Sequence, residues 1–179
     1  MLQPYIEGEL VYLSELKKEE LPLLLELYED EEFMEDFGYI EGVVQTYESL
    51  YTWYEELKLS EDEIFYSVYE KKTQEWIGFI SLMDINEGER EGWLVIGLTQ
   101  IKRGKGFGKE AMFYLINEAF HQGLTTIRLS VLSHNERAIR LYKKLGFKLE
   151  MIYPKEQFPN FFQVDIIELS LEETEFNSR

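Results

Sequence analysis

The sequence predicts a mixed α/β fold in which helices flank one sheet, and three observations lead to this class. Segments that alternate between apolar and polar side chains, as strands do, occur near both ends and in the middle of the chain. Segments whose apolar residues recur at helical spacing lie between them. No repeat, low-complexity linker or break in composition divides the 179 residues, so we expect one domain over residues 1–179.

The composition excludes several kinds of protein and of site. With 45% hydrophobic and 15% aromatic residues, the chain is too apolar to be disordered. It has no cysteine, which excludes disulfides, thiolate nucleophiles, cysteine-bound zinc and iron–sulfur clusters. Met1–Glu7 lacks the basic flank and apolar run of a signal peptide, and no apolar stretch approaches the length of a membrane span. We therefore expect a soluble, cytoplasmic protein with no membrane partner.

The charge is unevenly distributed. The net charge of −17 argues against nucleic acid as a partner, because phosphate binding needs a basic face. Residues 1–91 hold 25 acidic and 6 basic side chains, whereas residues 92–179 hold 10 acidic and 12 basic ones. This difference has two interpretations: solvated helix faces, or an acidic half that handles a cation beside a basic half that handles an anion.

Elements of the first half follow from spacing and capping. Pro22 fits only the first turn of a helix, and Thr46 is an N-cap residue type. We expect a strand over 9–13, a helix from about Leu21, the acidic run Glu29–Asp36 and a helix from Thr46 to about Lys58. Three strands follow, Ile64–Glu70, Trp76–Ile85 and Trp93–Thr99, joined by polar turns.

The second half alternates helices and strands. A helix is expected from the glycine-rich segment to about Gln122, because Gly123 stands where a helix stop belongs. Strand Thr126–Leu132 comes next. Ser133–Glu136 reads as a capping box that opens a helix to Leu145. Two final strands are expected over Phe147–Tyr153 and Phe161–Leu171.

The strongest local signal is the segment Arg103–Lys109, which lies between a strand and a helix and contains three alternate glycines. Such glycines let the backbone approach a ligand, and the positive end of the following helix favours anions, phosphates above all. A nucleotide P-loop would need Gly at 103 and Ser or Thr at 110, and a dinucleotide fingerprint would need Gly at 109. Neither pattern is met. The alternative is a tight turn that binds nothing.

A second pattern lies downstream on the helix that ends at Leu145. Asn135 and Tyr142 share a stripe with Ala138 and Leu141, since seven residues are nearly two helical turns. For each residue a structural role competes with a functional one. An aromatic on an apolar stripe is usually core, and Asn at a helix start is usually a cap.

Together the two patterns resemble a known family. Arg103-x-x-Gly106-x-Gly108 after a strand, followed by Asn135-x-x-Ala138-x-x-Leu141-Tyr142-x-x-Leu145-Gly146-Phe147, is similar to the GNAT superfamily of N-acetyltransferases. The opening Gly8–Leu13 and the length resemble its ribosomal-protein N-acetyltransferase and spermidine acetyltransferase branches. The resemblance spans most of the chain and is sharpest over about 93–147.

The resemblance implies acetyl-CoA as the acetyl donor, no metal, and a place for each part of the donor. The pyrophosphate would lie on the backbone of Arg103, Gly104, Lys105, Gly106, Phe107, Gly108 and Lys109. Ile96, Gly97 and Leu98 would pair with the pantetheine arm and aim an N–H at the thioester oxygen. Asn135 would hydrogen-bond the arm, and Tyr142 would face the sulfur as general acid. The family fold implies a mixed, mostly antiparallel sheet that splays between Trp93–Thr99 and Thr126–Leu132, and family habit implies a homodimer.

The reaction so implied is direct acetyl transfer to a primary amine in a ternary complex, because no cysteine is present to form an acetyl-enzyme. The acidic half favours a cationic acceptor, such as a polyamine or a protein N-terminus.

One departure from the family pattern leaves an alternative open. Many relatives carry a glutamate near the start of the fourth strand that can act as base, and here Trp93 stands in its place. The base is then open among Glu89, Glu91, Asp84 and Glu63. A non-catalytic protein that keeps the fold and binds CoA as a sensor or scaffold is the rival interpretation.

Overall fold

A computed structural model describes residues 2–38, 45–159 and 163–176. An eight-stranded sheet forms its centre, in the order β1-β2-β3-β4-β5-β6-β8-β7. Every neighbouring pair is antiparallel except β5 and β6, which are parallel. The strands are β1 (Tyr5–Glu7), β2 (Val11–Glu15), β3 (Ile64–Glu70), β4 (Trp76–Asn86), β5 (Glu91–Leu98), β6 (Thr126–Leu132), β7 (Lys148–Tyr153) and β8 (Ile166–Glu172). The expected class, a mixed and mostly antiparallel sheet flanked by helices, is confirmed.

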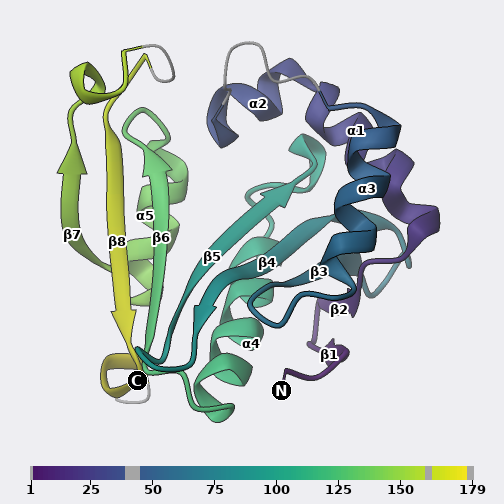
Figure 1. The fold of residues 1–179 in the computed structure, drawn as a ribbon, viewed down its shortest axis with the longest axis horizontal. Helices are drawn as coiled ribbons and strands as arrows, with labels where there is room; N and C mark the ends of the chain where they lie inside the picture. Colours follow the sequence, from purple (N-terminus) through teal and green to yellow (C-terminus); the bar gives the residue numbers. More distant parts are fainter. Residues whose placement is uncertain (1, 39–44, 160–162, 177–179) are drawn as a thin grey trace.

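Helices cover both faces of the sheet (Figure 1). The α-helices are α1 (Leu21–Glu29), α2 (Glu31–Phe37), α3 (Tyr47–Leu57), α4 (Phe107–His121), α5 (Glu136–Leu145) and α6 (Glu173–Phe176). Three 3-10 turns connect elements at Lys18–Glu20, Gln100–Lys102 and Lys155–Gln157. In Figure 1, α1, α2 and α3 lie in front of the sheet, whereas α4 passes behind it. We call the first the α1–α3 face and the second the α4 face.

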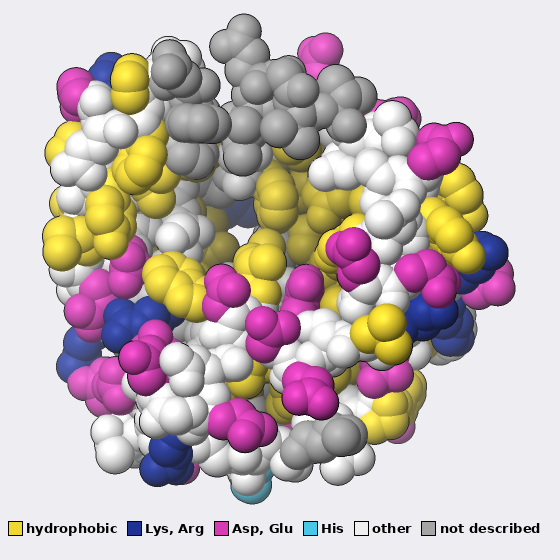
Figure 2. All heavy atoms as spheres, viewed as in Figure 1, with side chains coloured by type: hydrophobic (Ala, Val, Ile, Leu, Met, Phe, Trp, Pro, Cys, Tyr) yellow, Lys and Arg dark blue, Asp and Glu magenta, His cyan; other side chains and the backbone are white. Residues whose placement is uncertain are grey.

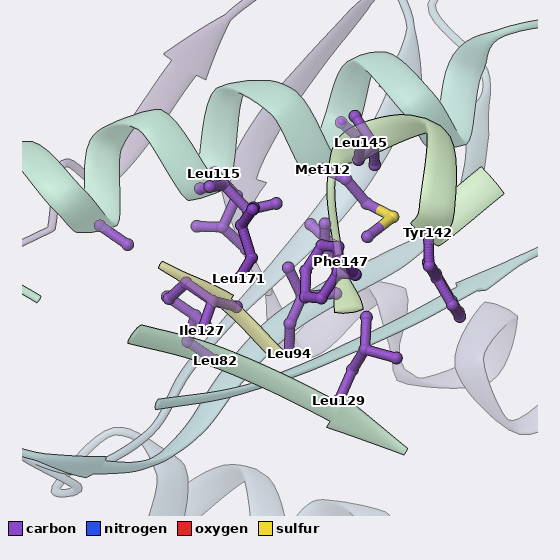
Figure 3. Close-up of a cluster of buried hydrophobic side chains, with 14 of the residues drawn as sticks. Leu82, Leu94, Met112, Leu115, Ile127, Leu129, Tyr142, Leu145, Phe147 and Leu171 are labelled. Carbon is purple, nitrogen blue, oxygen red and sulfur yellow. The ribbon is translucent and has the colours of Figure 1, made fainter. Parts of the chain in front are cut away.

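The two faces have separate cores because alternate residues of a strand point to opposite sides. In β4, Ile80 and Leu82 belong to the cluster under α4, whereas Phe79 belongs to the cluster under α1–α3. Figure 3 shows part of the α4-side cluster, which gathers side chains from β4, β5, β6, α4 and α5. Each face therefore presents its own set of side chains to anything bound beside β5.

The sheet opens between β5 and β6. The two strands pair only over Glu91–Trp93 and Thr126–Arg128, and then diverge (Figure 1). Beyond Trp93 the edge of β5 has no strand partner, so its backbone groups on that side are available to a ligand. The expected splay between these strands is confirmed.

The N-terminal strand differs from its prediction. It begins at Val11 rather than at residue 9, and a short strand, β1, precedes it. The cause is Glu110 of α4, whose carboxylate accepts hydrogen bonds from the N–H groups of Glu9, Leu10 and Val11 at 3.2, 2.7 and 2.8 Å. Glu9 and Leu10 therefore lie in a turn around the carboxylate, and the pairing of β2 begins only at Val11.

The acidic run Glu29–Asp36, which carried no helix prediction, forms most of α2. Asp30 caps this helix by accepting a hydrogen bond from the Phe33 N–H at 3.0 Å, and Phe33 packs into the core of the α1–α3 face. The prediction that Thr46 caps the next helix is confirmed, since its hydroxyl accepts from the Ser49 N–H at 3.1 Å.

Two predictions in the second half need correction. The capping box at Ser133 is wrong, because the N-cap of α5 is Asn135, whose side chain accepts a hydrogen bond from the Ala138 N–H at 3.1 Å. The last long strand begins at Ile166, not at Phe161, because the backbone bends just before it. The first two residues of that predicted strand, 161 and 162, lie outside the described residues.

Within the described ranges, no helix combines the length and the apolar character needed to cross a bilayer. In the same ranges, His, Asp and Glu side chains do not gather in groups of three that suit a metal ion.

Candidate active site

The glycine segment before α4 forms a row of unpaired amides. Gly104 and Gly106 have φ values of +71° and +90°, the left-handed region that only glycine adopts readily. Of the N–H groups from 104 to 109, none donates a hydrogen bond to another described residue. Because they precede and begin a 15-residue helix, they lie in the positive end of its dipole. This arrangement suits an anion with several oxygens.

The other residues of the segment contribute in different ways. The side chains of Lys105 and Lys109 are exposed, whereas that of Phe107 is buried in the core, which leaves only its backbone for a ligand. A Cβ at Gly108 would lie 3.3 Å from Leu98 Cδ1, so this glycine allows α4 to pack closely on β5. Gly108 thus serves packing, while Gly104 and Gly106 shape the loop.

Arginines lie on both sides of the loop. Arg103 donates from Nε to the Leu98 carbonyl at 3.1 Å and pairs through Nη1 with Asp36 of α2 at 3.2 Å. Its side chain is therefore bound to α2, and its N–H donates to the Gln100 carbonyl at 3.1 Å, so the free amides of the loop begin at Gly104. Arg137 of α5 is exposed, and its Nη2 lies 2.9 Å from where a Cβ on Gly104 would be. The sequence reasoning missed Arg137, although it lies two residues after Asn135.

The free edge of β5 presents the N–H groups of Ile96 and Leu98, whereas that of Gly97 points toward β4. The Thr99 N–H donates to the Ile77 carbonyl of β4, so it points toward β4. In an antiparallel pair, the N–H groups of every second residue point to the same side of the strand. The N–H groups of Ile96 and Leu98 therefore point to the opposite edge, where pairing with β6 has ended. Gly97 serves packing, because a Cβ there would lie 2.7 Å from Phe33 Cζ.

Asn135 lies at the mouth of the split and is engaged at both ends of its side chain. Its oxygen caps α5, and its Nδ2 donates to the Asp36 carbonyl at 3.3 Å. The neighbouring His134 places Nε2 3.0 Å from the Glu35 carbonyl. The end of α2 is thus held from both sides of the split, by Arg103 on one side and by His134 and Asn135 on the other.

Tyr142 lies on α5 at the margin of the α4-side core, 8% exposed, and in Figure 3 its side chain descends from the helix toward the sheet. Burial raises the pKa of Tyr142 to about 12. Its hydroxyl makes no hydrogen bond with any residue that the structure describes. A buried phenol with an unused donor suits a ligand atom placed in the split.

The opposite face contains a chamber of about 360 Å³ that sequence reasoning did not identify. Figure 2 shows this face, with hydrophobic side chains in a central hollow and acidic side chains on the surface below it. The chamber is lined by Tyr28, Phe37, Gln45, Leu50, Trp53, Glu63, Phe65, Phe79, Ser81, Met83 and Val95. The sequence feature that could have indicated the chamber is the alternation of side chains in β4. This alternation places residues 79, 81 and 83 on the same face of the sheet.

The structure separates the four carboxylates that were considered as bases. Glu91 is paired with Arg128 at 2.9 Å, and the side chains of Glu89 and Asp84 are exposed. Glu63 lines the chamber. Burial raises the pKa of its carboxyl, and the charges of Asp62 and Asp84 raise it further. Glu63 is therefore the carboxylate of this group that lines a cavity.

Comparison with known proteins gives a family. The profile described as "Acetyltransferase (GNAT) domain" matches residues 11–148. Two curated Bacillus subtilis (strain 168) proteins, the uncharacterized N-acetyltransferases YdgE and YycN, are each 32% identical to the chain, over 88 and 82 residues. These matches cover 40% and 37% of this chain, and 56% and 53% of those proteins, so they span about half the length of each relative.

Solved structures extend the likeness of fold to nearly the whole chain. A chimera of the spermidine N-acetyltransferase SpeG from Vibrio cholerae and hSSAT superposes with a TM-score of 0.84 at 23% identity, covering 96% of this chain and 100% of that one. Spermidine N-acetyltransferase from Vibrio cholerae in complex with CoA and spermine gives a TM-score of 0.84 at 21% identity, covering 95% and 99%. At these identities the likeness establishes the fold.

Proposed function

Because the chain belongs to the GNAT acetyltransferase domain family, we propose that it transfers an acetyl group from acetyl-CoA to a primary amine. The observation that carries this proposal is the row of unpaired N–H groups from 104 to 109, which opens beside the split between β5 and β6. A pyrophosphate on those amides would direct the rest of acetyl-CoA along the free edge of β5.

The binding roles follow from the groups that are available. The amides of Gly104–Lys109 hold the pyrophosphate, and Arg137 adds a positive charge above Gly104. Ile96 and Leu98 offer N–H groups to the pantetheine arm and the thioester oxygen. One backbone N–H aimed at the developing oxyanion is worth on the order of 3 kcal/mol. In this proposal Asn135 acts by holding the start of α5, because both ends of its amide are already used.

Tyr142 is proposed to serve the departing sulfur. With a pKa of about 12 against ~8.5 for a thiol, full proton transfer from the phenol to a free thiolate would be uphill by roughly 5 kcal/mol. The hydroxyl therefore donates a hydrogen bond to sulfur while the C–S bond breaks, and the proton moves only as negative charge builds up there. Its lack of any other partner among the described residues keeps it available for this role.

The acceptor is proposed to be a cationic amine such as a polyamine or a protein N-terminus. Spermine is the ligand named for one structural neighbour, and residues 1–91 of this chain carry most of its acidic side chains. The rival, a CoA-binding sensor or scaffold, draws support from Trp93, since β5 carries no carboxylate beyond Glu91.

One experiment separates the two. Purified protein is incubated with acetyl-CoA and a panel of amines, and CoA is followed as free thiol while binding of acetyl-CoA is measured by calorimetry. We expect amine-dependent thiol release. Binding of acetyl-CoA without release for any amine would instead support the sensor, and absence of binding would refute both.

A further inference from the structure

The chamber on the α1–α3 face carries information about the acceptor that the family assignment does not. Resting on the proposed function, we propose that the acceptor is a singly charged primary amine on a hydrophobic, ring-sized body, chemically an arylalkylamine, and that Glu63 holds its ammonium group and takes its proton. Three features of the chamber point to such an acceptor: its walls, its charge and its place beside β5.

The walls are unusually aromatic. Five rings line the chamber, and they contact one another: Phe65 and Phe79 stack at 4.8 Å between centroids, and Trp53 meets Phe65 edge-on at 5.0 Å. Phe37 of α2 closes the opposite side against Phe79 at 5.8 Å. Such a surface binds an apolar or aromatic body by burial and ring contacts, and ring faces also attract an ammonium group.

The charge of the chamber admits one cation. Among the described residues that line it, Glu63 is the only charged side chain. The other polar groups are neutral and belong to Gln45, Ser81, Tyr28 and Trp53. An ammonium beside Glu63 would be paired. Asp62 and Asp84 lie near Glu63 but do not line the chamber. A second ammonium of a polyamine deeper in the chamber would therefore lie among aromatic, aliphatic and neutral polar side chains of the described lining, and an unpaired buried charge is costly. The described lining therefore favours a monocation.

Burial and the neighbouring carboxyl groups raise the pKa of Glu63, which makes it a better proton acceptor. Asp62 adjoins it, Asp84 lies close enough to raise its pKa, and Tyr28 of α1 faces it across the chamber. Asp84 has a φ of +50°, an uncommon value for a residue other than glycine, at an irregularity of β4. A carboxylate with a raised pKa is a stronger proton acceptor at neutral pH than an ordinary one.

The chamber is also placed for the reaction. Val95 of β5 lines it, and Val95 is the neighbour of Ile96, whose N–H points to the free edge where the thioester is proposed to lie. Glu63 takes one proton from the ammonium, and the neutral nitrogen attacks the acetyl carbon. The N–C bond forms and the C–S bond breaks while the thiolate takes the proton of Tyr142, and the second proton that leaves the nitrogen restores the Tyr142 hydroxyl. Glu63 then releases its proton to solvent. The net products are the N-acetylamine, CoA and one proton released to solvent.

The test compares matched amines and matched variants of the full chain. Phenethylamine and spermidine are assayed by thiol release with acetyl-CoA, using the wild type, Glu63→Gln and Glu61→Gln. Glu61 is an exposed carboxylate two positions away that does not line the chamber, so its variant makes the same change in net charge. We expect kcat/KM for phenethylamine to exceed that for spermidine by about 10–100-fold, because the ring body is buried.

The variants give the second readout. Glu63→Gln should lower kcat/KM for phenethylamine by about 10²-fold, raise KM and abolish the acidic limb of the kcat–pH profile, with acetyl-CoA affinity unchanged. Glu61→Gln should behave as the wild type. A preference for spermidine would overturn the proposal and leave the proposed function intact. Equal behaviour of the two variants would overturn the role of Glu63. Turnover of neither amine nor any other would refute the proposed function itself.

Discussion

The two faces of the sheet at β5 differ in how their binding groups are built. On the α4 face, the proposed pyrophosphate site consists of backbone N–H groups that come from consecutive residues between 104 and 109. On the α1–α3 face, the chamber consists of side chains that come from three helices, three strands and the segments between them, spread from Tyr28 to Val95. A site of the first kind is encoded in a short run of glycines, whereas a site of the second kind exists only after the chain has folded.

The two faces also differ in charge, but the difference in available charge is smaller than the net charges of residues 1–91 and 92–179 suggest. The loop side keeps exposed cations at Lys105, Lys109 and Arg137. On the other side, part of the acidic run is already used: Asp30 caps α2, and Asp36 pairs with Arg103 and lies 3.6 Å from His134. Net charge by region therefore overstates the field that a cationic acceptor would meet, because paired and capping carboxylates contribute little to it.

The largest effect is expected on acetyl-CoA affinity, from a substitution in the glycine loop that leaves the chamber unchanged. Gly106→Asp places a negative charge beside the row of amides, and should weaken acetyl-CoA binding by roughly 10²–10⁴-fold, the worth of about two charge-assisted hydrogen bonds. Gly106→Asn is the matched control, since Asn bears the same strain at φ +90° without the charge. Calorimetry compares the affinities and thermal unfolding checks both folds. Equal affinity in the two variants would contradict an anion site.

Tyr142→Phe acts between the two faces, on the reaction itself. The substitution keeps the ring that packs 6.0 Å from Phe147 and removes only the hydroxyl. We expect kcat to fall by about 10²-fold or more, with acetyl-CoA affinity and unfolding temperature nearly unchanged. With the pKa of this phenol raised to about 12, it stays protonated over the whole assay range, so the wild type should show no loss of kcat from Tyr142 up to about pH 10. A normal kcat in the variant would return Tyr142 to a purely structural role.

Arg137→Gln tests how far the loop site extends onto α5. If its guanidinium meets a phosphate above Gly104, acetyl-CoA affinity should fall by about 5–10-fold, and the decrease should shrink as salt is raised. Arg140→Gln is the control from the same helix, because Arg140 is exposed and paired with Glu136 at 3.2 Å. Equal losses in the two variants would indicate a general charge effect without a specific contact.

The smallest effect concerns the acidic side chains of α2. This helix carries Glu31, Glu32, Glu35 and Asp36, but Asp36 is paired with Arg103 and Glu32 bonds to Gln100. Glu35→Gln should therefore raise KM for a cationic acceptor only about 2–3-fold at low salt, and this difference should vanish well above ~0.15 M, where the screening length is about 8 Å. Glu87→Gln, an exposed carboxylate at the β4–β5 turn, is the control. A salt-independent effect would argue for a direct contact of Glu35.

Elements that depend only on neighbouring residues along the chain could be predicted before the structure. Strands Ile64–Glu70 and Thr126–Leu132 and the cap at Thr46 match their predictions because alternation and capping are local. The same holds for the glycine loop, where left-handed φ values and the start of α4 fix the direction of the amides. For this reason the family was recognisable from two short motifs, and the proposed donor site rests on the same local features.

Only the tertiary structure decided which side chains meet. Glu110 shortens β2 from a distance of about 100 positions in the sequence, and Asn135 serves the end of α2 as well as its own helix. Of the four carboxylates considered as bases, Glu63 is the one that lines the chamber with Tyr28 and Trp53, where burial raises its pKa. No local sequence pattern predicts this burial. The physical reason is that hydrogen-bond direction in a loop is set by the φ and ψ of a few residues. The solvation and pKa of a side chain are set instead by whatever the whole fold packs around it.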